Sequence, residues 1–213
     1  QGFKKYKNIK FYYTDGKANT AIQVINVEDM IKAEVDVIIA SPSNAKVMTP
    51  VIEKAYDKGI PVVLLSRTIT SDKYTTFIHP KNSLIAHQAA NFIINKINMK
   101  GHILMLQGVP NASSTINRSK EFIKVVSQYP NIKVTTEVAN YLRKDAIFAV
   151  EKHLAQGKTF DAIYAQSDSM AVGAILALTK HKQNPKSVLI VGIDYISEAK
   201  DNQSLLSRKR MES

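Results

Sequence analysis

The sequence predicts an α/β fold in which two similar lobes each contain a parallel β-sheet. Short apolar runs alternate with longer stretches that carry apolar residues at helical spacing, and this alternation is typical of βαβ units. Three short sequences also recur in the same order at nearly one offset, which indicates that one design is used twice. The alternative explanation of the recurrence is chance, because buried strands resemble one another.

Five wholly apolar runs are predicted to be strands, since parallel strands covered on both faces need few polar side chains. Amphipathic stretches between them are predicted to be helices. The pairs Lys58-Gly59 and Lys100-Gly101 mark boundaries between elements. The strands are expected at residues 35–40, 61–65, 103–106, 162–165 and 188–191, and three helices around residues 47–55, 84–97 and 122–126.

The internal repeat also indicates what the first half lacks. In the second half, a predicted strand and the helix through Phe122 precede a Pro-Asn-Ile-Lys sequence, whereas only residues 1–6 precede the matching Lys-Asn-Ile-Lys. We therefore expect this chain to be the middle part of a longer one. The repeated pairs are 7–10 with 130–133, 36–41 with 161–167, and 62–66 with 188–192.

The composition excludes several classes of protein. Hydrophobic residues make up 45% of the 213 residues, which is enough for a core and excludes a disordered chain. The presence of only eight glycines excludes a collagen-like chain, and no apolar run approaches the roughly 18 residues of a membrane-spanning helix. The absence of cysteine excludes disulfides, thiolate metal sites and cysteine nucleophiles.

The formal net charge is +11, from 29 Lys and Arg against 18 Asp and Glu. Such a balance can indicate a nucleic-acid partner or an acidic membrane surface, and the alternative is a solvated basic surface. The lysines are spread along the chain, and the compact cluster at residues 208–210 has no aromatic-rich nucleic-acid motif beside it. We favour the solvated surface and expect no nucleic-acid partner.

Candidate binding residues are the polar side chains that follow the predicted strands, because ligands of open α/β folds bind outside the carboxyl ends of the strands. Serine and aspartate also cap helices, so capping is the alternative role, above all for Ser43 and Asp168. Arg67 and Asp194 differ, since a charge that follows a buried strand is costly unless it is paired or faces water. The candidates are Ser41, Ser43, Ser66, Arg67, Ser167, Asp168 and Asp194.

Patterns that would indicate catalysis are missing from the sequence. There is no Gly-x-Ser-x-Gly motif, no Walker loop and no glycine-rich dinucleotide motif. The five histidines are not spaced as metal ligands, and no pair of carboxylates stands out for acid/base work. We therefore expect no catalytic residues, no metal and no cofactor, and we predict binding without chemistry.

Several stretches resemble the type 1 periplasmic solute-binding proteins of the sugar (ribose-binding-like) class. The first-lobe resemblance lies at residues 36–42 and 59–63. Leu-Gln-Gly at 106–108, followed by Arg118 and Phe122, is similar to the entry into the second lobe. The ligand-sensing domains of lactose-repressor-type regulators are related to this family. The most specific matches are residues 165–174 and 191–194.

The resemblance implies two Rossmann-like lobes, the first incomplete, joined by a hinge and closing over a small polar ligand. We expect a partial N-terminal lobe at residues 1–81, a C-terminal lobe at 82–213 and a hinge near 80–83. The family's N-terminal strand and its C-terminal segments have no counterpart here, and residues 204–213 do not match the family's continuation.

The ligand-binding positions of the family, carried over by position, fall on seven residues. Arginine offers forked donors to hydroxyl or carboxylate oxygens, aspartate accepts from hydroxyls, and a tyrosine ring stacks on the apolar face of a sugar. A surface position for Arg118 and a core position for Tyr141 are the alternatives. The seven residues are Ser41, Ser66, Arg67, Arg118, Tyr141, Ser167 and Asp194.

Four positions depart from the ribose-type pattern. Ser41, Ser66 and Ser167 stand where the family commonly has Asn, Asp and Asn, and these shorter side chains lose bidentate hydrogen bonding. Lys81 stands where an aspartate is usual near the hinge. Because the site then gains basic character, a small anionic ligand is an alternative to a sugar-like ligand.

The implied function is that of a bacterial periplasmic receptor. It would capture a small polar solute, with no chemistry, and present it to the permease of an ABC transporter or to a membrane sensor, and we expect it to be a monomer. The alternative is the effector domain of a lactose-repressor-type transcription regulator, which would require a helix-turn-helix module. An enzyme on the same fold is a third alternative.

Overall fold

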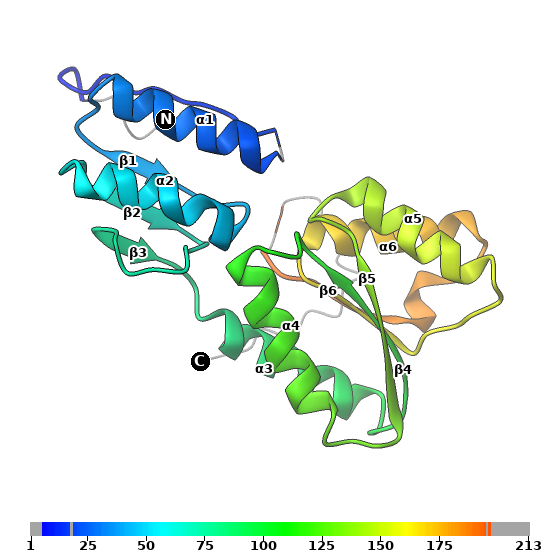
Figure 1. Cartoon of the computed structure of the whole chain (residues 1–213). Helices are drawn as coiled ribbons and strands as arrows, with labels where there is room; N and C mark the ends of the chain where they lie inside the picture. Colours follow the sequence, from blue (N-terminus) through cyan, green and yellow to red (C-terminus); the bar gives the residue numbers. More distant parts are fainter. Residues whose placement is uncertain (1–5, 18, 195, 197–213) are drawn as a thin grey trace. The chain divides into compact units, whose positions relative to one another are not determined.

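The computed structural model describes residues 6–17, 19–194 and 196. They form an α/β protein with two compact units, Gln1–Ile78 (unit 1) and His79–Ser213 (unit 2), each with its own parallel sheet (Figure 1). The predicted fold class is therefore confirmed. The hinge near residues 80–83 and the boundary at 81/82 stay predictions. The basic cluster at 208–210 and the tail at 204–213 lie outside the described residues.

Unit 1 contains a three-stranded sheet in the order β1-β2-β3, with all neighbours parallel. Its helices begin at asparagine residues whose side chains accept hydrogen bonds from the first turn, and Asn44 rather than Ser43 is the cap of α2. Asn19 accepts from Ala21 N–H at 2.9 Å, and Asn44 accepts from Val47 N–H at 3.0 Å. The elements are α1 (Thr20–Lys32), β1 (Ile38–Ala40), α2 (Ala45–Asp57), β2 (Val62–Leu65) and β3 (Thr76–Ile78).

The core of unit 1 lies on one face of this sheet. Val27 of α1 and Ile52 of α2 pack against strand residues that point to that face, among them Ile38 and Leu64. The strand expected at 35–40 is shorter in the structure, because β1 pairs only with β2 and that pairing starts at Ile38. The rest of the predicted run precedes the ladder.

Unit 2 contains a four-stranded parallel sheet in the order β5-β4-β6-β7. The predicted strand at 162–165 is found with the same bounds, and those at 103–106 and 188–191 are found with shifted ends. The elements are α3 (Asn82–Lys96), β4 (Gly101–Gln107), α4 (Ser113–Val126), β5 (Ile132–Val138), α5 (Arg143–Leu154), β6 (Ala162–Ala165), α6 (Asp168–Lys180), a 3-10 helix (Pro185–Ser187) and β7 (Leu189–Val191).

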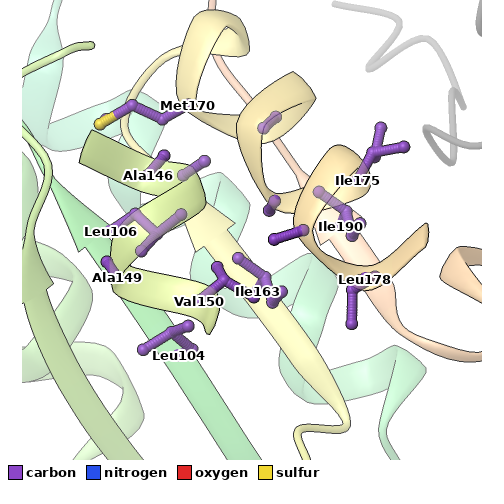
Figure 2. Close-up of a cluster of buried hydrophobic side chains, with 14 of the residues drawn as sticks. Leu104, Leu106, Ala146, Ala149, Val150, Ile163, Met170, Ile175, Leu178 and Ile190 are labelled. Carbon is purple, nitrogen blue, oxygen red and sulfur yellow. The ribbon is translucent and has the colours of Figure 1, made fainter. Parts of the chain in front are cut away.

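Both faces of the unit 2 sheet are covered by helices. On one face, α5 and α6 meet the strands, and Figure 2 shows Ile163 and Ile190 beneath them. On the other face, α3 and α4 cover Met105, and Phe122 stacks on Tyr164 with ring centroids 4.2 Å apart. All four residues of β6 are buried as a result, which explains why this strand carries no charged side chain and why its one hydroxyl, that of Tyr164, has no hydrogen-bond partner.

Candidate functional site

Polar side chains gather at the carboxyl edge of the unit 2 sheet. They come from Gln107 at the end of β4, from Gln166 and Asp168 after β6, and from Asp194 after β7. Because the strands are parallel, their carboxyl ends meet at the same edge, where α4 also begins. The edge is therefore built from segments that lie far apart in the sequence.

Arg118 lies on the second turn of α4 and is buried, with 5% of its surface exposed. Its Nε donates to Asn82 Oδ1 at 2.9 Å, and its Nη1 donates to the main-chain carbonyl of Gln166. These bonds give partners to two of the five N–H groups of the buried guanidinium. The structure thus places Arg118 inside the edge of the sheet, which excludes the surface-arginine alternative.

Asp194 follows β7 and has a φ of +105°, a value that non-glycine residues rarely adopt. The side chain is exposed, yet the protein around it removes part of its hydration, and this raises the pKa of its carboxyl. Arg118 acts in the opposite direction and Asp168 adds to the rise. The three charged groups therefore lie within electrostatic reach of one another, and the structure brings the predicted Arg118 and Asp194 together.

Ser167 lies at the same edge and is buried. It is the N-cap of α6, and its Oγ accepts from Met170 N–H at 3.4 Å. The capping alternative weighed for this position is therefore realised. The hydroxyl proton is not used by that bond, so Ser167 can still donate one hydrogen bond.

Tyr141 has a φ of +62° and packs its ring against Gly108 at the end of β4. A Cβ at position 108 would lie 2.0 Å from the ring, so any other residue there would require the Tyr141 ring to move. The Tyr141 hydroxyl lies 3.0 Å from Ser114 Oγ and 2.8 Å from Thr115 Oγ1, on the first turn of α4. The phenol is half-buried and fixed by these contacts.

An amide network that the sequence did not indicate lies beneath these groups. Ser119 Oγ accepts from Gln107 Nε2 at 2.7 Å and from Gln166 Nε2 at 2.8 Å. Gln166 Oε1 accepts from Gly108 N–H at 3.2 Å. The available signal was that Gln107 and Gln166 directly follow apolar strands, but glutamine at such a position is equally typical of a turn.

In unit 1, Ser41 follows β1 and is exposed. A side chain that was not predicted, Gln23 of α1, closes the turn after this strand. Its Nε2 donates to the Ser41 carbonyl at 2.8 Å, and its Oε1 accepts from Ser43 N–H at 2.8 Å. Ser43 Oγ lies 2.8 Å from Thr20 Oγ1, so Ser43 has a structural role at this turn.

Ser66 and Arg67 follow β2, as predicted from the apolar run before them. Ser66 is exposed, has a φ of +62° and donates its N–H to the carbonyl of Ile78 at 2.8 Å. Arg67 is partly buried and donates its N–H to the Leu65 carbonyl at 2.6 Å. Together these bonds make a sharp bend at the carboxyl end of β2.

The unit 2 edge offers neutral donors and acceptors around one guanidinium and two carboxylates. Across the part of the chain that the structure describes, no three His, Asp or Glu side chains come together as a metal site. Among the same residues, no helix is both long enough and apolar enough to cross a membrane. The donors and acceptors at this edge are suited to hydrogen bonding with a polar ligand.

Comparisons with known proteins agree with this architecture. Residues 2–203 match the family model described as "Periplasmic binding protein domain". The chain is 29% identical over 198 residues to the xylitol-binding protein of Mycolicibacterium smegmatis and 28% identical over 190 residues to the ribose import binding protein RbsB of Bacillus subtilis. It also resembles the solved fructose binding periplasmic domain of a hybrid two component system, with 31% identity and a TM-score of 0.88.

These matches include most of the chain but less of each relative. They cover 92% of this chain and 56% of the xylitol-binding protein, and 89% of this chain and 61% of the ribose import binding protein. The structural match covers 95% of this chain and 69% of the fructose-binding domain. The resemblance found in the sequence is confirmed, and the chain belongs to the periplasmic binding protein domain family, in the type 1 sugar class.

Proposed function

We propose that this protein is a solute-binding receptor that captures a sugar or polyol. The observation that carries the proposal is that Arg118 and Asp194 lie within electrostatic reach of each other at the carboxyl edge of the unit 2 sheet. A guanidinium donates in a fixed fork and a carboxylate only accepts, so the two together match the alternating donor and acceptor roles of neighbouring hydroxyl groups.

The charge at this edge favours a neutral ligand over the anionic one that the sequence left open. Asp168 and Asp194 stand near Arg118, and when Arg67 of unit 1 is included the two carboxylates balance the two guanidinium groups, so the proposed site has no net positive charge. An anionic ligand would meet two carboxylates there, and like charges at short range oppose binding. The printed names of the relatives, which refer to xylitol, ribose and fructose, support the same class of ligand.

The binding site in this proposal consists of the residues carried over from the family. Arg118 and Asp194 make the principal polar contacts, and Tyr141 and Ser167 contribute from the same unit. Their positions at one edge of one sheet support this assignment. The contributors proposed from unit 1 are Ser41, Ser66 and Arg67.

The partner in this proposal is a membrane protein, and the location is the bacterial periplasm. The printed name of the ribose import binding protein supports delivery to an import system, for which we propose an ABC transporter permease, and that of the fructose-binding domain, part of a hybrid two component system, supports delivery to a sensor. The matched relatives are named as binding proteins. We propose accordingly that this chain acts as a monomer without enzymatic activity.

The test is a thermal-shift screen of the purified chain with xylitol, D-ribose, D-fructose and two small acids, followed by titration calorimetry. A ligand that binds only the folded state at 100 times its Kd adds about 2.7 kcal/mol of stability, which is readily seen as a rise in Tm. We expect a polyol or sugar to raise the Tm and the acids to leave it unchanged. A screen in which no sugar or polyol raises the Tm would overturn the proposal.

A further inference from the structure

The turn after β6 and the first residue of α6 contact Arg118 and the residues on either side of Asp194. We propose that Gln166 and Asp168 are positioning residues: Gln166 holds Arg118 in place, and Asp168 holds the segment that carries Asp194. That this arrangement serves ligand binding rests on the proposed function. The positioning itself is a property of unit 2 and can be tested without a ligand.

Gln166 is completely buried, and each of its polar groups has a partner. Its main-chain N–H donates to the Leu106 carbonyl at 3.1 Å, and its Oε1 accepts from Gly108 N–H, so it is tied to the end of β4 at two points. Its Nε2 donates to Ser119 on α4. One side chain therefore links the sheet edge to the helix that carries Arg118.

The acceptor that Gln166 offers to Arg118 is its main-chain carbonyl, which every substitution at position 166 retains. The side-chain amide has a different task, because it fixes the distance between α4 and the strand ends through Ser119. Loss of the amide would leave the buried Gly108 N–H without its acceptor and would leave Ser119 bonded only to Gln107. The guanidinium would then lose its fixed position relative to the carbonyl.

Asp168 plays the corresponding part for the loop after β7. Its main-chain N–H donates to the Ile193 carbonyl at 2.6 Å, and its Oδ2 accepts from Ile196 N–H at 3.1 Å. Its Oδ1 lies where a side chain at Gly192 would be, since a Cβ there would come within 2.2 Å of that oxygen. Asp168 thus holds the loop on both sides of Asp194.

The hydrogen bonds from Asp168 to the residues on both sides of Asp194 explain how Asp194 keeps its unusual backbone conformation. A φ of +105° in a non-glycine residue is held only when the surroundings determine it, and the bonds to Ile193 and Ile196 flank the residue directly. Groups that are already in place when a ligand arrives need little ordering on binding, which strengthens affinity.

The experiment is hydrogen exchange by NMR on the whole ¹⁵N-labelled chain. The Arg118 Nε–H signal, assigned by its loss in Arg118→Lys, reports on the arginine, and the Ile196 N–H signal reports on the loop. Both rates are divided by that of Ile163 N–H in the buried centre of β6, which removes the effect of global unfolding.

We expect Gln166→Leu to speed the exchange of Arg118 Nε–H about tenfold relative to Ile163 and to leave Ile196 unchanged. Asp168→Ala should speed the exchange of Ile196 N–H about tenfold relative to Ile163 and leave Arg118 Nε–H unchanged. The conservative variant Asp168→Asn keeps an acceptor oxygen and should restore slow exchange of Ile196 N–H. The matched controls are Gln128→Leu and Asp72→Ala at exposed positions, which should change neither ratio.

Equal changes of both signals in both variants, or no change in either, would overturn the proposal, because Gln166 and Asp168 would then stabilise the unit without positioning anything. Titration with xylitol, D-ribose and D-fructose separates this outcome from failure of the proposed function. The Kd of whichever ligand binds the unaltered chain should be at least about tenfold higher for both variants. If none of the three binds the unaltered chain, the receptor function fails while the exchange ratios still decide the positioning.

Discussion

The two sheets of this protein have equivalent strands but differ in how their faces are covered. β1 corresponds to β6 and β2 to β7, and α1 and α2 correspond to α5 and α6. Ile38 and its counterpart Ile163 are both buried beneath these helices. On the opposite face, Ile39 is 42% exposed, whereas its counterpart Tyr164 is fully buried under α3 and α4.

The comparison extends to the edge of each sheet. In unit 2, β4 lies between β5 and β6 and pairs with both. In unit 1, residues 9–15 correspond to β5, but among the described residues they pair with no strand, and Phe11 and Tyr13 are exposed. The difference shows that an apolar sequence alone does not make a buried strand; a neighbouring strand and a helix on each face are also needed.

The largest expected effect separates the uncovered face from the covered one. Tyr164→Ala should lower the free energy of unfolding by about 3–5 kcal/mol, because it removes a buried ring stacked on Phe122. Ile39→Ala, at the equivalent position, should change it by less than about 1 kcal/mol. Both changes in the free energy of unfolding can be measured by urea unfolding, with hydrogen exchange as the probe of each unit. A loss at Ile39 as large as that at Tyr164 would contradict the comparison.

Acid is expected to weaken unit 2 before unit 1. Burial lowers the pKa of His102 below its ordinary value of 6.5, and Lys133 adds to the drop. Burial raises the pKa of Glu137, but hydrogen bonds from Lys152 and His153 more than offset this, so its pKa lies below the ordinary 4.5. Neutral His102 therefore favours the folded state, and its contribution to the free energy of unfolding falls as the pH drops below 6.5. The contribution of ionised Glu137 falls as the pH drops below 4.5.

The control for this prediction lies in unit 1. The described groups there with shifted pKa values are Lys10 and Lys73, whose pKa values are raised by hydrogen bonds to Tyr12 and Asp57 and which titrate in alkali. Hydrogen exchange from about pH 7 to about pH 4 should therefore show unit 2 opening first. His102→Gln should flatten the upper part of that dependence. Opening of unit 1 first would contradict the assignment.

The smallest expected effect compares two equivalent helix caps. Asn44 caps α2 with a 3.0 Å bond to Val47 N–H, and Ser167 caps α6 with a longer bond of 3.4 Å to Met170 N–H. Asn44→Ala should lower the free energy of unfolding by about 1 kcal/mol, and Ser167→Ala by less. Urea unfolding of both variants tests this, and a larger loss at Ser167 would show that its hydroxyl has a further partner.

Much of the fold could be predicted because unit 2 meets the conditions that an apolar run assumes. The run at 162–165 has strands on both sides and helices on both faces, and its predicted bounds match β6. The run at 35–40 has a partner strand on one side only, so the ladder is restricted to Ile38–Ala40. β5 was not among the predicted strands because its alternating polar residues suit an edge strand, covered less completely than a central one.

The candidate site could be predicted only in part. Arg118 was predicted from the family resemblance, and Asp194 from that resemblance and from the cost of a charge that follows a buried strand; their roles in binding stay predictions. Gln166 and Asn82 were not found, because their partners are Arg118 and Ser119, far away in the sequence. Hydrogen bonds between distant segments follow from the folded arrangement and leave no local spacing to detect.

The contact between Gly108 and the ring of Tyr141 has a consequence for the genetics of this protein. A collection of all single substitutions should show that position 108 tolerates replacement poorly, because each new side chain would displace the Tyr141 ring, although it belongs to none of the three apolar cores. In such a map, low tolerance at position 108 would identify the point where the backbone packs directly against an aromatic ring.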